Sequence, residues 1–418
     1  MKKNVMWAAI ALMMAMSGCT GNVINDDVIN DDPLSNENNE RRDISLTRAE
    51  EDLVNGNNDF AFNLFRKVSD KPQSMILSPI SITYALGMLN NGAAGETQKE
   101  INSVLGFGET GADGINAFCR KMLTEAPSLD KLTKVMIANT IYMNKGYELK
   151  KEFVSKAKTY YDAEPETRDF ADGKTRDVIN KWGSDHTEKL IKEVLSEEEF
   201  DPSAISYLLN AIYFKGAWAE KFDKTTTKDE TFKGYSAEKK VPMMRQEHEF
   251  GYTETDDCQV LCLPYGNNAY RMTILLPKEG KTVADVAKTL TAEKWQQFKW
   301  MGNALVDVKL PRFESKTDLG LENIMSALGM PKAFSSNAEF PDFCNVPTYI
   351  GMMKQSAIIK VNEEGTEAAA ITVIGVKMSS VGPSDPKRVN FYATRPFLYV
   401  ISEQSTDAIF FVGQYMGD

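Results

Sequence analysis

The sequence contains very little histidine. Only two histidines, His186 and His248, occur among its 418 residues. Hydrolases of the Ser-His-Asp type and many zinc sites need at least one well-placed imidazole, but neither histidine lies in an HExxH motif and the sequence has no GxSxG motif. We therefore interpret both as surface residues, and we expect a protein that is not an enzyme and holds no metal ion.

Cysteine is also scarce, and no spacing of it resembles a zinc ribbon. The chain has five cysteines. Cys258 and Cys262 are expected on one strand, where four residues span roughly 13 Å, which is too far for a disulfide bond. After Cys19 we predict four buried or half-buried thiols, with a disulfide among them left open: Cys119, Cys258, Cys262 and Cys344.

The sequence has fewer basic than acidic residues: it contains 48 Lys and Arg and 59 Asp and Glu, so its net charge is −11. An acidic surface repels phosphate backbones, which argues against nucleic acid as a partner. Apolar residues make up 42% and charged residues 26% of the chain, an ordinary balance for a soluble globular protein. No low-complexity gap follows residue 51, so one large domain fits better than two.

The first residues have the pattern of a signal peptide. Two lysines precede an apolar run at 5–16, which is too short for a comfortable membrane span. The run is followed by Ser17, Gly18 and Cys19. A cysteine directly after Ser-Gly resembles a bacterial lipoprotein signal, so we predict that residues 1–18 are removed and that Cys19 is acylated. A plain secretory signal with an incidental cysteine is the alternative.

Residues 19–50 are predicted to form the lipidated N-terminus and a disordered tether, because they are rich in Asn, Asp and Glu and lack periodic apolar positions. The folded domain is then expected to cover 51–418. Thr20 in place of Asp after Cys19 favours the outer membrane, by analogy with lipoprotein sorting. We expect a secreted protein that is lipid-anchored to the bacterial envelope, at the outer membrane or cell surface, and that meets the membrane through Cys19 alone.

The folded part mixes helix and strand patterns without strict alternation, which favours an α+β fold with large, mainly antiparallel sheets. Apolar residues on one side predict a helix at 59–68. Ser78 and Pro79 are preferred at a helix start, and Asn91-Gly92 would end that helix. Further helices are predicted at 155–161, 174–188, 283–289 and 319–328, and strands at 135–143, 206–214, 259–263, 270–276, 304–310, 357–361, 389–392, 397–401 and 408–412.

The stretch from 361 to 388 is the most unusual. Three alanines flanked by glutamate lead into the β-rich run Ile-Thr-Val-Ile-Gly-Val. A loop with Gly382, Pro383 and Pro386 follows. Strand propensity that ends in an exposed loop is notable, because proteases cut such loops and function is often located on them.

Five blocks between residues 59 and 416 resemble the serpin family, in the family's order. Residues 391–401 are similar to its C-terminal signature, although Thr394 departs from the usual Asp or Asn, and 408–413 resemble its final strand. Residues 78–97 look like the second helix and its exit, and 208–218 like the strand that opens the central sheet. The fifth block resembles the hinge of inhibitory members, and it consists of Glu363, Glu364, Gly365, Thr366, Glu367, Ala368, Ala369 and Ala370.

The resemblance implies a serpin fold, with a large mainly antiparallel central sheet, additional sheets, about eight to nine helices and an exposed reactive-centre loop. It further implies a monomeric suicide-substrate inhibitor without catalytic residues or cofactor. The loop at about 363–388 would be cut, form an acyl-enzyme with the target protease and insert into the central sheet. Expected targets are elastase-, trypsin-, chymotrypsin- or subtilisin-like serine proteases, with papain-like cysteine proteases as a further class.

The register of the cut is open. Counting from Gly365 by the usual hinge length places it between Ser379 and Ser380, but the connection to the next strand is longer than usual. The specificity pocket of a trypsin-like protease would accept Lys377. The pocket of an elastase- or chymotrypsin-like protease would accept Met378. We rank cleavage after Met378 first, after Lys377 second and after Ser379 third. The candidate residues at the cut are Val376, Lys377, Met378, Ser379 and Ser380.

The hinge composition suits insertion. A strand that starts at Thr366 would carry only small, hydroxylic or apolar residues on one face, and no proline interrupts it before residue 380. The resemblance also implies a polar cluster under the sheet, with Gln355 where the family commonly has histidine, and an aromatic residue where the loop enters. The expected sheet-opening residues are Ser78, Ser81, Asn210, Trp218 and Gln355.

Two other functions are considered. A non-inhibitory serpin would act as a carrier or binding protein, but it is expected to have bulky or charged residues on the inserting face. A surface lipoprotein that binds glycans or nutrients would need a platform of exposed aromatic residues, and the sequence shows no clear cluster of them. Inhibition of proteases is therefore the leading prediction.

Overall fold

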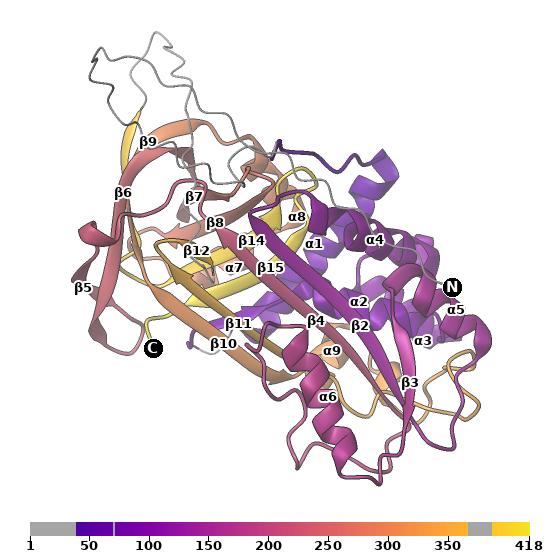
Figure 1. Cartoon of the computed structure of the whole chain (residues 1–418). Helices are drawn as coiled ribbons and strands as arrows, with labels where there is room; N and C mark the ends of the chain where they lie inside the picture. The colour runs from indigo at the N-terminus through magenta and orange to yellow at the C-terminus, as the bar shows by residue number, and fades with distance from the viewer. Residues whose placement is uncertain (1–38, 70–71, 367–386) are drawn as a thin grey trace, which may run out of the picture. The chain divides into compact units, whose positions relative to one another are not determined.

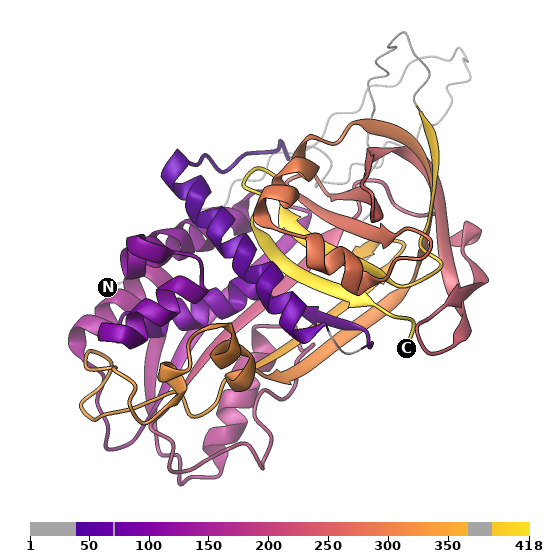
Figure 2. The same cartoon turned by 180° about the vertical axis from the view of Figure 1, so that it is seen from behind.

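A computed structural model of the chain describes residues 39–69, 72–366 and 387–418. The predictions for Cys19, for the second half of the hinge and for all five candidates at the cut lie outside these residues. The described part contains nine α-helices and two β-sheets (Figures 1 and 2). This confirms the predicted α+β class with mainly antiparallel sheets.

The central sheet has six strands in the order β10-β11-β12-β4-β2-β3. All neighbours in it are antiparallel except β2 and β3, which are parallel. The strands are β10 (Phe313–Gly320), β11 (Lys354–Asn362), β12 (Gly365–Thr366), β4 (Ser206–Ala217), β2 (Thr133–Asn144) and β3 (Glu164–Arg168).

The second sheet has nine strands in the order β1-β15-β14-β8-β7-β6-β9-β13, with β5 beside β6. Its strands β8, β14 and β15 are buried along their whole length, which agrees with their mostly apolar sequences. The strands are β1 (Met75–Leu77), β5 (Lys228–Lys233), β6 (Glu238–Glu254), β7 (Cys258–Tyr265), β8 (Tyr270–Pro277), β9 (Asn303–Pro311), β13 (Arg388–Tyr392), β14 (Phe397–Glu403) and β15 (Ile409–Tyr415).

Helix α2 (Pro79–Asn90) is buried along almost its whole length, and it contacts β4 of the central sheet and β15 of the second sheet. A helix that is apolar on all sides is expected to lie inside the protein. Its start at Pro79 and its end before Asn91 agree with the prediction. The other helices are α1 (Arg48–Val68), α3 (Gly95–Val104), α4 (Gly111–Glu125), α5 (Lys151–Tyr161), α6 (Lys174–Asp185), α7 (Val283–Thr289), α8 (Ala292–Gln297) and α9 (Glu322–Leu328).

The start of the folded unit differs from the predicted boundary at residue 51. Helix α1 begins at Arg48, where Thr47 and Glu50 form a capping box. The compact unit begins earlier, at Asn39. The Ile44 side chain is buried, and its backbone N–H donates to Ser405 Oγ at 2.9 Å. Residues 39–50 therefore pack on the domain, and only the segment before them is left for the predicted tether.

One predicted helix was placed too early. The segment predicted as a helix at 319–328 begins inside β10, and α9 starts only at Glu322. Residues of β10 alternate between buried and exposed, the pattern of a strand with one face on the core. The four cysteines of the described part are free thiols, with Cys258 and Cys262 both on β7 as predicted.

Among the described residues, no helix is long and apolar enough to cross a membrane. Nor do these residues bring together three or more His, Cys, Asp or Glu side chains in an arrangement suited to a metal ion.

Candidate functional site

The central sheet is interrupted between β4 and β11. The two-residue strand β12 joins them at one end, where Thr366 pairs with Val361 of β11 and with Gly216 of β4. From there toward Ser206 and Lys354, no ladder of the described residues connects β4 to β11. A cavity of about 650 Å³ opens there. We call this space, bounded by 206–214 and 354–359, the slot.

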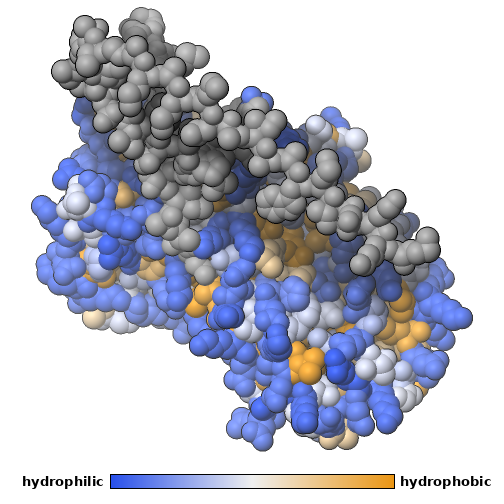
Figure 3. All heavy atoms as spheres, viewed as in Figure 1, coloured by the Kyte–Doolittle hydropathy of each residue, from blue (hydrophilic) through white to orange (hydrophobic). Residues whose placement is uncertain are grey.

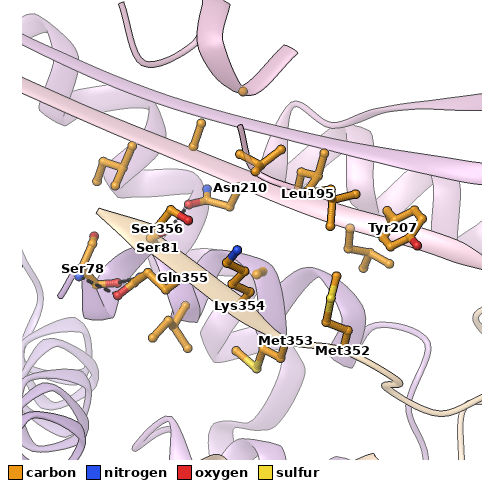
Figure 4. A pocket seen from close by; sticks show the side chains of 18 of the residues that line it. Ser78, Ser81, Leu195, Tyr207, Asn210, Met352, Met353, Lys354, Gln355 and Ser356 are labelled. Carbon is orange, nitrogen blue, oxygen red and sulfur yellow. Dashed lines mark hydrogen bonds between the residues drawn. The ribbon is translucent and has the colours of Figure 1, made fainter. Parts of the chain in front are cut away.

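The slot has a polar and an apolar lining. In Figure 4, Gln355, Lys354 and Met352 line one side, while Asn210, Leu195 and Tyr207 line the other. On the face seen in Figure 1, apolar residues come to the surface in patches between hydrophilic ones (Figure 3). A space between two strands with free edges and apolar walls is suited to an additional strand.

Thr366 shows which face of an added strand would point inward. Its side chain is buried, and its hydroxyl oxygen lies 2.5 Å from the hydroxyl oxygen of Tyr265. Side chains alternate along a strand, so every second residue after Thr366 would face the core in the same register. This is the face for which the sequence offers small, hydroxylic or apolar residues.

The turn that leads into β12 is held by buried charge. Glu363 is buried, and the Nε and Nη2 atoms of Arg312 donate to its carboxylate at 2.6–2.8 Å. The Thr227 hydroxyl donates to the same carboxylate at 2.5 Å. Burial alone would raise the pKa of Glu363, but the hydrogen bonds from Arg312 and Thr227 hold that pKa below its ordinary value. The carboxylate is therefore charged and fully paired.

Glu364 is fixed on the outer side of the same turn. Its carboxylate oxygens lie 2.9 Å from Lys221 Nζ and 2.8 Å from Lys224 Nζ. Hydrogen bonds from Lys224 and then Lys221 lower the pKa of Glu364. The two glutamates thus attach the turn to two separate chain segments, residues 221–227 and Arg312.

Trp218 closes the end of the slot at which the turn lies. Its backbone N–H donates to the carbonyl of Glu364 at 2.8 Å, and its indole N–H donates to the carbonyl of Asn362 at 2.9 Å. The indole stacks on Tyr265 with ring centroids 4.5 Å apart. Trp218 therefore lies against the turn that leads into β12, and its part in the entry of the loop stays a prediction.

Gly365 occupies a position that only glycine fits. Its φ is +149°, and a Cβ atom added there would lie 2.0 Å from the carbonyl oxygen of Gly216. The turn and the close approach to β4 both require the missing side chain.

The predicted polar cluster forms two pairs beneath the slot. Ser78 N–H donates to Gln355 Oε1 at 3.0 Å, and Gln355 Nε2 donates to the Ser78 carbonyl at 2.8 Å. Ser81 donates to Asn210 Oδ1, and Asn210 Nδ2 donates to Asn139 Oδ1 at 2.8 Å. Gln355 thus connects β11 to the start of α2 without a titratable group.

Ser78 differs from the prediction in one respect. It occupies the N-cap position of α2, but its side chain makes no capping hydrogen bond. Its hydroxyl donates instead to the carbonyl of Phe410 on β15, at 2.9 Å. The hydroxyl therefore connects the helix start to the second sheet.

Several residues of the site were not predicted. Arg312, Thr227 and Tyr265 hold the turn and β12, and Asn139 extends the polar pair of Asn210. No local motif marks these residues, because each acts through a contact with a distant part of the chain.

Comparison with known proteins agrees with this geometry. Residues 55–417 match the family model Serpin (serine protease inhibitor). Serpin B6 of Macaca fascicularis is 33% identical over 374 residues, covering 87% of this chain and 98% of its own. An uncharacterised serpin-like protein of Thermococcus kodakarensis is 30% identical over 431 residues, covering 100% of this chain and 99% of its own.

Solved structures are similar along most of the chain. Tengpin, a thermophilic serpin in its native state, is 27% identical with a TM-score of 0.79, over 91% of this chain and 97% of its own. Human thyroxine-binding globulin in complex with thyroxine is 26% identical with a TM-score of 0.78, over 88% of this chain and 98% of its own. With matches of this extent to the family model, to relatives and to structures, the chain belongs to the serpin family.

Proposed function

We propose that this serpin inhibits serine proteases, and papain-like cysteine proteases as a further class, as a suicide substrate. The protease's nucleophilic oxygen or sulfur attacks the carbonyl carbon of a peptide bond at 376–380, the C–N bond breaks, and the new amine leaves with a proton. The N-terminal part of the loop stays bound to the protease as an ester or thioester. It then enters the slot as a strand and carries the protease with it before water can release the enzyme.

The observation that carries this proposal is β12, which lies at the end of a slot that no other strand of the described residues fills. The strand is already paired on both sides at Gly365 and Thr366, so further residues could add in the same register. Each new backbone hydrogen bond contributes about 1 kcal/mol net, so about ten of them contribute about 10 kcal/mol. In this register Thr372 would come level with Asn210 and Gln355, whose side-chain amides could form hydrogen bonds with its hydroxyl.

A carrier function is the second candidate. It is favoured by the similarity to thyroxine-binding globulin, a serpin solved with its hormone, and by the size of the slot, about 650 Å³. The buried Thr366, followed in sequence by alanine at 368 and 370, favours strand insertion instead. A carrier has no need for a face that can be buried in a sheet.

We further propose that the protein is a bacterial lipoprotein anchored through Cys19 to the outer membrane, where it would protect the envelope from foreign proteases. The signal-like residues 1–18 and the Ser-Gly-Cys sequence support this. Mass spectrometry of the N-terminal peptide from a membrane fraction tests it, since a diacylglyceryl cysteine at 19 is expected. A mature N-terminus without lipid, at a residue other than Cys19, would contradict the proposal of a lipid anchor.

The inhibitory function is tested with residues 20–418, purified and mixed with elastase, trypsin, chymotrypsin, subtilisin and papain. We expect an adduct that survives boiling in detergent, at the summed mass of the protease and the large fragment. The mass of the released C-terminal peptide would identify the cut among Val376, Lys377, Met378 and Ser379. Clean cleavage without adduct, by every protease that cuts, would contradict the proposal and favour the carrier.

A further inference from the structure

The end of the slot opposite β12 carries an ion pair. Lys354, the first residue of β11, places Nζ 2.8 and 3.0 Å from the two carboxylate oxygens of Glu199. The side chains are only 16% and 32% exposed. Hydrogen bonds from Lys354 and from the Ser196 backbone lower the pKa of Glu199, so this carboxylate is charged at neutral pH. Both side chains keep some exposure to solvent, so salt at high concentration screens the attraction between them in part.

The two charges belong to opposite sides of the slot. Glu199 lies in the connection between α6 and β4, next to Leu195 and Phe200, which pack in one apolar cluster with Tyr207 of β4. The Ser196 backbone N–H also donates to Glu199 Oε2 at 2.9 Å. This connection therefore packs with α6 and β4 on one side of the slot.

Lys354 belongs to the other side. Its strand β11 is paired with β10, and its Nζ lies 3.0 Å from Asp318 of β10. Met352, just before β11, packs against the apolar cluster of the α6 side. Among the described residues, the Lys354–Glu199 ion pair and the contact of Met352 thus span the slot at this end.

The ion pair lies where a long inserted strand would have to pass. Leu209 of β4 and Lys354 of β11 are both seven residues from the partners of Thr366, which are Gly216 and Val361 (216 − 209 and 361 − 354). An added strand would therefore pass between Leu209 and Lys354 at its seventh residue. Lys354 is adjacent to the buried Gln355, so it faces outward, toward the α6 connection.

We propose that the Lys354–Glu199 ion pair is a catch across the slot, which slows the entry of the second half of the inserted strand. The first residues after Thr366 can add without disturbing it. Passage beyond the level of Leu209 requires that the lysine and the carboxylate separate. The inference rests on the proposed function, because it concerns how the same slot admits a strand.

The catch is tested by measuring how fast a synthetic peptide with the sequence of residues 367–376 is taken up by the uncut chain 20–418, followed by native mass spectrometry. We expect Glu199→Gln to speed uptake about fivefold, the effect of losing one partly buried ion pair. Lys354→Met keeps the aliphatic stem and should speed uptake equally. The matched control is Asp318→Asn, which removes a carboxylate from the same lysine without crossing the slot and should not speed uptake.

Salt gives an independent measurement. Sodium chloride at high concentration should speed uptake by the wild type and leave Glu199→Gln unchanged. Equal rates for Glu199→Gln, Lys354→Met and wild type would overturn the catch, as would the absence of uptake by every variant. Faster uptake by both variants without any protease adduct would support the catch and overturn the inhibitory function.

Discussion

Replacing Thr366 by arginine separates cleavage of the loop from trapping of the protease. Thr366 is 2% exposed, and its hydroxyl contacts the buried Tyr265. An arginine would bring a charge into this buried position, and an unpaired buried charge costs several kcal/mol. The variant would therefore lose β12 and its pairing on both sides, which contributes about 3 kcal/mol at about 1 kcal/mol per hydrogen bond.

The loss should affect the start of insertion most. If the transition state of strand insertion loses about 3 kcal/mol of stabilisation, insertion slows about 100-fold. Hydrolysis of the acyl-enzyme then finishes first, so Thr366→Arg should be cleaved as an ordinary substrate.

The assay is the number of inhibitor molecules consumed per protease molecule trapped, with adducts counted on denaturing gels. Thr366→Val is the matched control, since it keeps the buried volume and removes only the hydroxyl; it should trap nearly as well as wild type. Trapping by Thr366→Arg at the wild-type stoichiometry would refute the reasoning that Thr366 begins the inserted strand.

Three further predictions concern the turn before β12. Gly365→Ala should lower the melting temperature of the uncut protein by several degrees and weaken trapping, because its Cβ would lie 2.0 Å from the Gly216 carbonyl oxygen; an unchanged calorimetric transition would contradict this. Arg312→Ala leaves the buried Glu363 carboxylate with one hydroxyl partner, so a loss of about 2–3 kcal/mol is expected in urea unfolding, whereas Arg312→Lys should lose less. The pKa values of Glu363 and Glu364 are both lowered from 4.5. The two carboxylates therefore contribute fully to the free energy of unfolding above pH 4.5, and this contribution is lost as the pH falls through the lowered pKa values. Urea titrations from pH 7 downward should show that loss in wild type and much less of it in a Glu363→Gln, Glu364→Gln double variant.

Local patterns predicted much of the scaffold. The Ser-Pro start of α2 and the mostly apolar sequences of β8, β14 and β15 are signals contained in a few residues, and the structure has a helix and three strands there. β6 was not predicted, because its 17 residues include many charges on the exposed side. The first turns of α1 were also missed, because only Leu53 and Val54 are apolar and buried before Asn57.

The site was predictable only in part. The hinge was recognised from its glutamate, glycine and alanine residues, and Trp218 from its resemblance. The groups that hold the hinge were not recognised: Thr227 lies 136 residues from Glu363 along the chain, and Arg312 lies 51 residues away. Such pairs are created by the sheet, which brings the ends of distant strands together.

The pairing of β12 on both sides also determines how an insertion would proceed in time. A strand that enters an empty sheet must first find its register, and a slip by one residue would turn every side chain to the wrong face. Here the nucleus exists before any bond is cut, because Gly365 is already paired with Ala217 of β4 and Thr366 with Gly216. Insertion would then proceed residue by residue from β12. Its speed would depend on how fast further residues pair with β4 and β11, and not on how fast the strand finds its register.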